Sequence, residues 1–240
     1  QGEWVDDLVS DVYYASVGLT IPVTYTYTYQ SVPMGAFTGV MEAGVYTVTA
    51  AIAEGVNYKG WTQDATLEIE KLSWTDDAGH LGELYFNDVT KLYDMTAHYA
   101  GVSFTDESLD EYVDSLTFFD GRLNITVEYL FNTDGSALYT DEFTGAVNAG
   151  AYYIKAVIPG TRNYDGYENT ATLTIGKLLF NDDEGQLGTL YYNGKTLTYD
   201  TNTYYAGVSL ANEWSNSLLY TLNYTLKGGE LTLTIAYTYT

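Results

Sequence analysis

The 240-residue sequence has no cysteine, which excludes disulfide bonds, a thiol nucleophile and zinc sites with cysteine ligands. Lysine and arginine total only nine, against 32 aspartate and glutamate residues, so the formal net charge is −23. Nucleic acid and anionic membrane surfaces need clustered basic side chains, so neither is an expected partner. No apolar run approaches the roughly 20 residues that cross a bilayer, and we expect no membrane insertion.

Proline is also scarce, with three residues against 23 glycines. This ratio suits tight turns between ordered strands better than a proline-rich tether. Tyrosine, in contrast, is heavily used at 26 residues, and both tyrosine and the abundant threonine favour strands. The composition therefore predicts a folded, strand-rich chain, whose length allows about two domains.

The sequence repeats itself at an offset of 106 residues. AGVYTVTAAIAEGVNYKG begins at Ala43, and AGAYYIKAVIPGTRNYDG begins at Ala149. The same offset relates ATLEIEKL to ATLTIGKL, LGELYFN to LGTLYYN, and HYAGVSF to YYAGVSL. A further element occurs three times, as GLTIPVTYTYTY, GRLNITVEYLFN and GELTLTIAYTYT. We therefore expect one complete module at 73–178, between a partial module at 1–72 that lacks its opening strands and one at 179–240 that lacks its closing strands.

Apolar and polar residues alternate within these segments. The predicted buried face of the first is Ile21, Val23, Tyr25, Tyr27 and Tyr29, and threonines form the other face. The segments at 125–131 and 231–239 alternate in the same way, and further buried rows are predicted at 46–52, 67–69, 152–158 and 173–175. Such alternation predicts strands with one buried face. Because the tyrosines share that face with aliphatic residues, core packing is favoured over a sugar-binding platform, whereas exposed tryptophan would favour a ligand. The tryptophans, Trp4, Trp61, Trp74 and Trp214, do not occupy equivalent places.

Turn signals separate the short strands, among them Asp120-Gly121, Asp134-Gly135 and Gly228-Gly229. Blocks of this kind near 100 residues long predict an all-β chain of tandem immunoglobulin-like β-sandwich modules arranged end to end. The junctions should fall near Lys71–Trp74 and Lys177–Phe180, and their shortness predicts stiff joints. A short helical turn is expected only within 106–116.

The ordered motifs resemble a known family. A tyrosine-rich strand, (N/E)AGxYx(V/I), NYxG and a closing ATLxIxK resemble the MBG-type bacterial immunoglobulin-like repeats of large surface proteins and adhesins. The resemblance implies an extracellular protein at the bacterial cell surface or cell wall, whose repeats form a stalk or an adhesive array, and it implies no catalytic residues. The acidic segment around 73–98 departs from the family pattern.

The residues give little sign of catalysis. No GxSxG motif or glycine-rich phosphate loop occurs. At the offset of 106 residues His80 aligns with Gln186 and His98 aligns with Tyr204, so neither imidazole is expected to belong to the repeated design. We predict that the protein is not an enzyme and has no catalytic or cofactor-binding residues.

Acidic residues follow each predicted module end. Asp76 and Asp77 in TDDAG have their counterparts in Asp182 and Asp183 of NDDEG. Paired carboxylates beside a glycine turn could bind calcium and stiffen a joint, although no DxDxDG loop is present and such a turn is commonly only solvated. Apart from this possible calcium, we expect no cofactor.

Lys71 and Lys177 occupy the same place at the end of an apolar strand. Burial would lower the pKa of such a lysine and allow an isopeptide bond to an asparagine side chain. The alternative is an ordinary lysine at a strand end that reaches into water.

The expected partners are adjacent repeats of the same protein. Because residues 211–240 resemble 1–30, the chain is expected to be part of a longer array, and a head-to-tail homo-polymer is the alternative. The predicted function is a rigid stalk or fibre-forming spacer; the alternative is an adhesin module that binds host glycan or protein.

Overall fold

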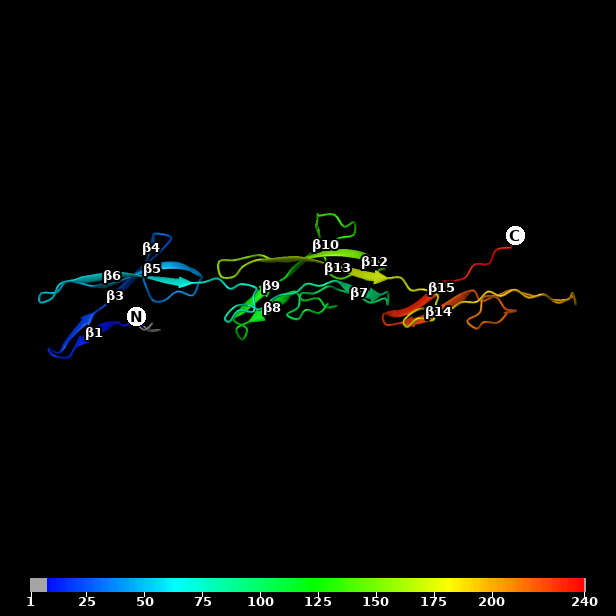
Figure 1. Cartoon of the computed structure of the whole chain (residues 1–240), viewed down its shortest axis with the longest axis horizontal. Helices are drawn as coiled ribbons and strands as arrows, with labels where there is room; N and C mark the ends of the chain where they lie inside the picture. Colours follow the sequence, from blue (N-terminus) through cyan, green and yellow to red (C-terminus); the bar gives the residue numbers. More distant parts are fainter. Residues whose placement is uncertain (1–7, 240) are drawn as a thin grey trace. The chain divides into compact units, whose positions relative to one another are not determined.

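The computed structural model describes residues 8–239, and within that range the chain forms strands, turns and bends but no helix (Figure 1). The predicted all-β class is therefore confirmed, with several sheets. Trp4 lies outside the described residues. In chain order the strands are β1 (Asp11–Tyr14), β2 (Leu19–Pro22), β3 (Thr24–Tyr29), β4 (Val32–Ala36), β5 (Gly44–Ile52), β6 (Trp61–Ile69), β7 (Val89–Leu92), β8 (Ser115–Phe118), β9 (Leu123–Thr126), β10 (Glu128–Asn132), β11 (Asp141–Glu142), β12 (Gly150–Ile158), β13 (Tyr167–Gly176), β14 (Thr221–Leu226) and β15 (Gly229–Thr234).

Two sheets contain most of the strands. One has the order β4-β3-β5-β6 and the other β11-β10-β12-β13-β7. All neighbours are antiparallel except β13 and β7, which pair in parallel with Leu173 opposite Val89. The hairpins β1-β2, β8-β9 and β14-β15 account for the other described strands.

The two larger sheets share one register at an offset of 106 residues. In β5 and β6, Tyr46 lies opposite Leu67. In β12 and β13, Tyr152 lies opposite Leu173. Because a slip of one residue would turn every side chain to the other face of the sheet, the shared register means that corresponding residues of the two copies face the same side.

The predicted alternation is present in β9, β12 and β13, whereas Val48–Ile52 of β5 are half-buried throughout, and the depth of burial differs between copies. In β9 and β10, Ile125 and Tyr129 are buried, and Val127 between the two strands is buried as well. Their counterparts at 21–25 in the first copy and at 233–237 in the third are only half-buried. The middle copy therefore contains the best-formed core, built on β12 and β13 and including Ile154, Ala156 and Leu173.

The helical turn expected within 106–116 is wrong. This stretch bends and then enters β8 at Ser115. The Gly101 amide donates to the Leu109 carbonyl at 2.9 Å, so pairing with a neighbouring segment replaces the local hydrogen bonds of a helix. No helix in the described part is long and apolar enough to cross a membrane.

The chain divides into two compact units. The first contains residues 1–82 together with 159–166, and the second contains 83–158 and 167–240. The turn between β12 and β13 thus belongs to the first unit, although both strands belong to the second. The division into modules at 1–72, 73–178 and 179–240 stays a prediction.

Candidate functional site

The turn between β12 and β13 packs against the start of β5 in the first unit. Its backbone runs parallel to the chain at Leu72, whose amide donates to the Asn163 carbonyl at 2.9 Å. The Asp165 amide donates to the Leu72 carbonyl, also at 2.9 Å. The indole Nε1 of Trp74 donates to the Asp165 carbonyl at 2.9 Å. These three hydrogen bonds hold the turn, and none of them involves a charged side chain.

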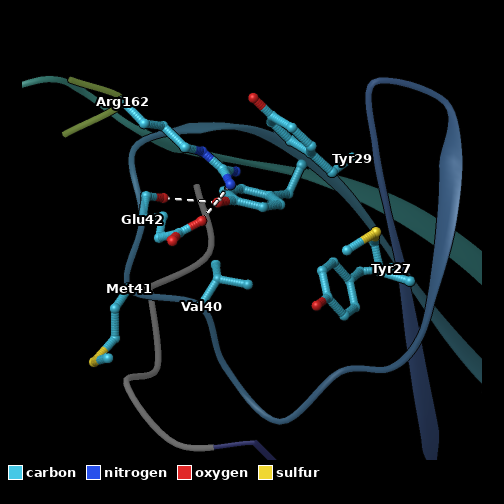
Figure 2. A pocket seen from close by; sticks show the side chains of 8 residues that line it. Tyr27, Tyr29, Val40, Met41, Glu42 and Arg162 are labelled. Atoms are coloured by element: carbon cyan, nitrogen blue, oxygen red, sulfur yellow. Dashed lines mark hydrogen bonds and ion pairs between the residues drawn. The ribbon is translucent and has the colours of Figure 1, made fainter.

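Arg162 lies at the centre of this contact (Figure 2). Its Nε donates to the Ala43 carbonyl at 2.9 Å, and its Nη2 donates to the Tyr46 hydroxyl at 2.7 Å. Nη1 pairs with the Glu42 carboxylate. The guanidinium also lies over the Tyr29 ring, 4.0 Å from its centroid. A guanidinium that is stacked, hydrogen-bonded and paired in this way is stabilised by several contacts at once.

Neighbouring groups complete the arrangement. The Asn163 side-chain oxygen accepts the Ala43 amide at 2.9 Å. The Tyr46 hydroxyl, besides accepting from Arg162, donates to the Glu42 carbonyl at 2.7 Å. A hollow of about 300 Å³ adjoins these residues, and it is lined by Tyr27, Tyr29, Met34, Val40, Met41, Glu42, Tyr46 and Arg162. Because Glu42 already balances the Arg162 charge, the arrangement is built to hold the turn rather than to bind an anion.

The first copy has the same turn at 53–60. The Gly55 amide donates to the Tyr58 carbonyl at 3.0 Å, as the Thr161 amide does to the Tyr164 carbonyl at 2.9 Å. Val56 stands where Arg162 stands in the second turn, and its side chain is fully exposed. The two turns therefore share a backbone shape but differ at the central side chain.

The predicted calcium residues lie in exposed turns. Asp182 accepts the Thr189 amide at 3.0 Å, and Asp183 accepts the Asn181 side-chain amide at 2.8 Å. Asp76 and Asp77 occupy the matching turn at the start of the middle copy and are exposed as well. Among residues 8–239 no three acidic or histidine side chains converge in a group that could hold a metal ion. Calcium binding stays a prediction.

The two candidate isopeptide lysines are exposed. Half of the Lys71 side chain is accessible, and its Nζ lies 4.0 Å from the Asp165 carboxylate. Lys177 is exposed too. The burial that would make a lysine nucleophilic is therefore missing at both positions. The covalent bond itself stays a prediction, to be tested by intact mass for the loss of ammonia.

Contacts of the two histidines correct the expectation that they stand apart from the repeated design. His80 Nδ1 accepts the Ser73 amide at 3.0 Å, and Gln186 Oε1 accepts the corresponding Leu179 amide at 2.5 Å. His98 is 4% exposed, and its Nε2 lies 3.1 Å from an Asp94 oxygen. In the third copy the Tyr204 hydroxyl donates to Asp200, the counterpart of Asp94, at 2.5 Å. The hydrogen-bonding role is repeated although the residue type is not.

His98 joins two aspartates in the middle copy. Its Nδ1 lies 2.9 Å from an Asp110 oxygen, and Lys91 Nζ lies 3.3 Å from the same oxygen. Burial alone would raise the pKa of Asp110, but hydrogen bonds from His98 and from the Tyr99 amide outweigh burial and lower this pKa below its ordinary value. Burial likewise opposes ionisation of Asp94, whose pKa is nevertheless lowered, chiefly by hydrogen bonds from Thr96. Both carboxylates are thus held in their charged form.

A substitution from the third copy tests this cluster. Asn216 is the counterpart of Asp110 and accepts the Tyr205 amide at 2.7 Å, just as Asp110 accepts Tyr99. A carboxylate whose folded pKa is lowered contributes stability above its unfolded pKa and loses it as the pH falls through the folded pKa. We therefore expect Asp110→Asn to flatten the acid-side loss of stability in the second unit, measured by urea unfolding between pH 6 and pH 2. An unchanged slope would contradict this assignment, and Asp183→Asn is the exposed control.

No protein-family model matches this chain, and no curated protein matches it.

Proposed function

We propose that the chain is a structural repeat region of a bacterial cell-surface protein and acts as a rigid stalk or fibre-forming spacer. Its motifs resemble the MBG-type immunoglobulin-like repeats, and its charge of −23 suits a soluble, extended role outside nucleic-acid or membrane binding. The proposal gives the protein no catalytic step, and places it extracellularly at the cell surface or wall.

Immunoglobulin-like sandwich modules form the repeating part of this proposal. The middle copy has a five-stranded sheet and the hairpin β8-β9, in which Leu116 and Ile125 are buried. Inward-facing residues on a sheet and on a hairpin are what two facing layers require. We infer that 73–178 is one such module and that 1–72 and 179–240 are parts of two others.

The observation that carries the proposal is the turn at 159–166. It is continuous with β12 and β13, yet its Arg162 and Asn163 are bound by groups at 42–46 of the first unit. Both partners of these contacts belong to the first unit, so the turn is a fixed part of that unit although it connects two strands of the second. A spacer gains from connecting segments that are held in this way rather than left as free loops.

We expect Arg162→Ala to loosen this contact. The variant loses three polar partners and the stacking on Tyr29. We expect the free energy of local opening of the turn to fall by only about 1–2 kcal/mol, because the Arg162–Glu42 ion pair is partly exposed to solvent. Spin labels on cysteines introduced at Thr47 and Asp165, both in the first unit, should give a narrow distance distribution in the parent chain and a broader one in the variant, and the lack of native cysteine makes the labelling specific.

Val56→Ala is the matched control, because Val56 is the counterpart of Arg162 and has no contact of this kind. It should leave the distribution unchanged. A distribution that is already broad in the parent chain would overturn the spacer proposal.

A second candidate function is an adhesin module that binds host glycan or protein. Trp61 is 47% exposed, and it adjoins an open apolar hollow in the first unit. Exposed aromatic faces stack on sugars. Binding to a glycan array that is lost in Trp61→Ala, in a chain with a broad label distribution, would favour the adhesin over the spacer.

A further inference from the structure

His98 is a buried titratable side chain of the second unit, 4% exposed, and a carboxylate faces each of its ring nitrogens. Its Nδ1 lies 2.9 Å from an Asp110 oxygen, and its Nε2 lies 3.1 Å from an Asp94 oxygen. Ionised carboxylates only accept hydrogen bonds, so both contacts are hydrogen bonds only when both ring nitrogens carry a proton. The geometry therefore fits the charged imidazolium form of His98.

Two lysines lie on the outer side of this pair of carboxylates. Lys91 Nζ lies 3.3 Å from the Asp110 oxygen that faces His98. Lys227, from the turn between β14 and β15, has its Nζ 3.9 Å from the second Asp94 oxygen. Both lysine side chains are largely exposed, whereas the imidazole is enclosed, so water screens the lysine contacts far more than those of His98.

Only one group of this cluster is of a type that ordinarily titrates near neutral pH. Burial would raise the pKa values of Asp94 and Asp110, but hydrogen bonds outweigh burial and lower both below the ordinary value, so both carboxylates stay ionised. Ala146, which pairs with the His98 backbone from the adjoining segment, has no titratable side chain. An imidazole is the side chain whose charge ordinarily changes between about pH 5 and pH 8.

The Asp94 carboxylate shapes the turn that follows β7. The oxygen that faces His98 also accepts the Thr96 amide at 2.8 Å and the Thr96 hydroxyl at 2.5 Å. Between these two residues Met95 has a φ of 66°, a left-handed conformation that a side chain of this size adopts only when its surroundings hold it there. Asp94 is therefore a positioning residue for the turn 94–96.

The turn between β14 and β15 rests on the turn 94–96. The Gly228 amide donates to the Asp94 carbonyl at 2.8 Å. A Cβ atom at position 228 would collide with the Met95 carbonyl, so this close approach requires glycine. The contact between the two turns thus depends on the shape that the Asp94 side chain gives to the first of them.

The third copy has the same turn, at 200–202, with neutral partners. Its aspartate-to-amide bond is present at 3.0 Å, and its central residue is again left-handed. Tyr204 stands in the place of His98 and donates to the turn's aspartate at 2.5 Å, and Asn216 stands in the place of Asp110. A phenol and an amide do not ordinarily change charge near neutral pH. The turn therefore needs no imidazole to form, and the titratable group is found where a hairpin rests on the turn.

We propose that His98 makes the contact between the turn 94–96 and the β14-β15 turn sensitive to pH, holding it when the imidazole is charged and loosening it when the imidazole is neutral. As the pH rises, one ring proton leaves to water, and the other stays on Nδ1, which makes the shorter contact. The Nε2 lone pair then faces an Asp94 oxygen, and two acceptors at this distance repel each other. Asp94 shifts, the turn loses its shape, and the bond to Gly228 weakens.

Hydrogen exchange of the Gly228 amide, followed by NMR, reports on this contact directly. We expect its protection factor, corrected for the pH dependence of intrinsic exchange, to fall at least about tenfold between about pH 5 and pH 8, because a hydrogen bond to a charged group is lost behind it. In the same titration the Gly228 amide resonance should move with the midpoint of the His98 ring resonance.

His98→Gln removes the titrating group, and the glutamine amide can still donate to Asp94. We expect the Gly228 protection factor of this variant to change less than about twofold over the same range, since no imidazole remains in the cluster. His80→Gln is the matched control, because Gln186 makes the corresponding contact in the third copy. This control should keep the whole pH dependence of the parent chain.

A constant Gly228 protection factor in the parent chain, or a fall that persists in His98→Gln, would overturn the proposal. A Gly228 resonance that follows the ring of His80 instead of the ring of His98 would overturn it too. If His98→Gln does not fold, the two midpoints in the parent chain decide the question alone. The inference does not depend on the spacer function, whose spin labels lie in the first unit, so each can fail without the other.

Discussion

Leu173→Ala is expected to lower the free energy of unfolding of the second unit by about 2–5 kcal/mol. The Leu173 side chain is 0% exposed, in a strand flanked by β12 on one side and β7 on the other. Truncation there leaves a cavity whose walls belong to three strands and cannot easily close. Hydrogen exchange of the β12 and β13 amides measures the loss.

Leu67→Ala removes the same atoms from the counterpart position and is the matched control. Leu67 is only half-buried, and it lies on the edge strand β6. We expect a loss of about 1 kcal/mol, because a partly exposed site loses less apolar burial and leaves no closed cavity. Equal losses at Leu67 and Leu173 would contradict the difference in core formation between the first and middle copies.

Much of the strand structure follows from the sequence alone. The alternation of Ile125, Val127 and Tyr129 with polar residues sets which side chains turn inward, because the period of a strand is two. The recurrence of AGxY at Ala43 and Ala149 likewise anticipates the equal pairing of β5 with β6 and of β12 with β13. These features depend on neighbouring residues and short turns, which local sequence describes well.

The candidate site could be predicted far less well. Arg162 and Glu42 are 120 positions apart, and no local pattern relates them. A signal was nevertheless present, because Val56 and Arg162 differ within two turns that are otherwise alike. A position that departs from its repeat counterpart can mark a contact that only one copy makes.

The histidines illustrate a different limit. Alignment compares residue types, so Gln186 and Tyr204 appear unrelated to His80 and His98. A hydrogen bond asks only for a donor or an acceptor at the right place, and glutamine or tyrosine can supply one as well as imidazole. The contact to Asp94 or Asp200 thus survives the change of residue.

One tyrosine hydroxyl donates to a backbone carbonyl in each of the three copies. Tyr25 donates to the Val9 carbonyl at 3.1 Å, Tyr129 to Val113 at 2.9 Å, and Tyr237 to Leu219 at 2.9 Å. The sequence predicted that Tyr25 and Tyr129 face the core, but core packing alone did not anticipate that their hydroxyls bind backbone groups. A buried phenol generally requires such a partner.

Tyr129 should make the second unit sensitive to alkali. Burial, opposed by a hydrogen bond from the Val102 amide, raises the pKa of Tyr129 to about 12. In the unfolded chain this pKa is about 10, so between pH 10 and 12 the unfolded state loses a proton that the folded state keeps. Stability therefore falls as the pH rises, by about 3 kcal/mol over that interval from this residue.

Tyr129→Phe separates this effect from general charge repulsion. At pH 8 the variant should be less stable than the parent by about 1–3 kcal/mol, because the Val102 amide and the Val113 carbonyl lose their partner inside the core. Towards pH 12 the difference should shrink to near zero, since the variant has no phenol to hold protonated. Urea midpoints at pH 8, 10, 11 and 12 measure it. Tyr25→Phe, in the first unit, should leave the alkaline slope of the second unit unchanged. A constant difference in stability between the parent and Tyr129→Phe at every pH would contradict this prediction. It would show that the Tyr129 phenol ionises as readily in the folded chain as in the unfolded one, and so that the fold does not shield its hydroxyl from water.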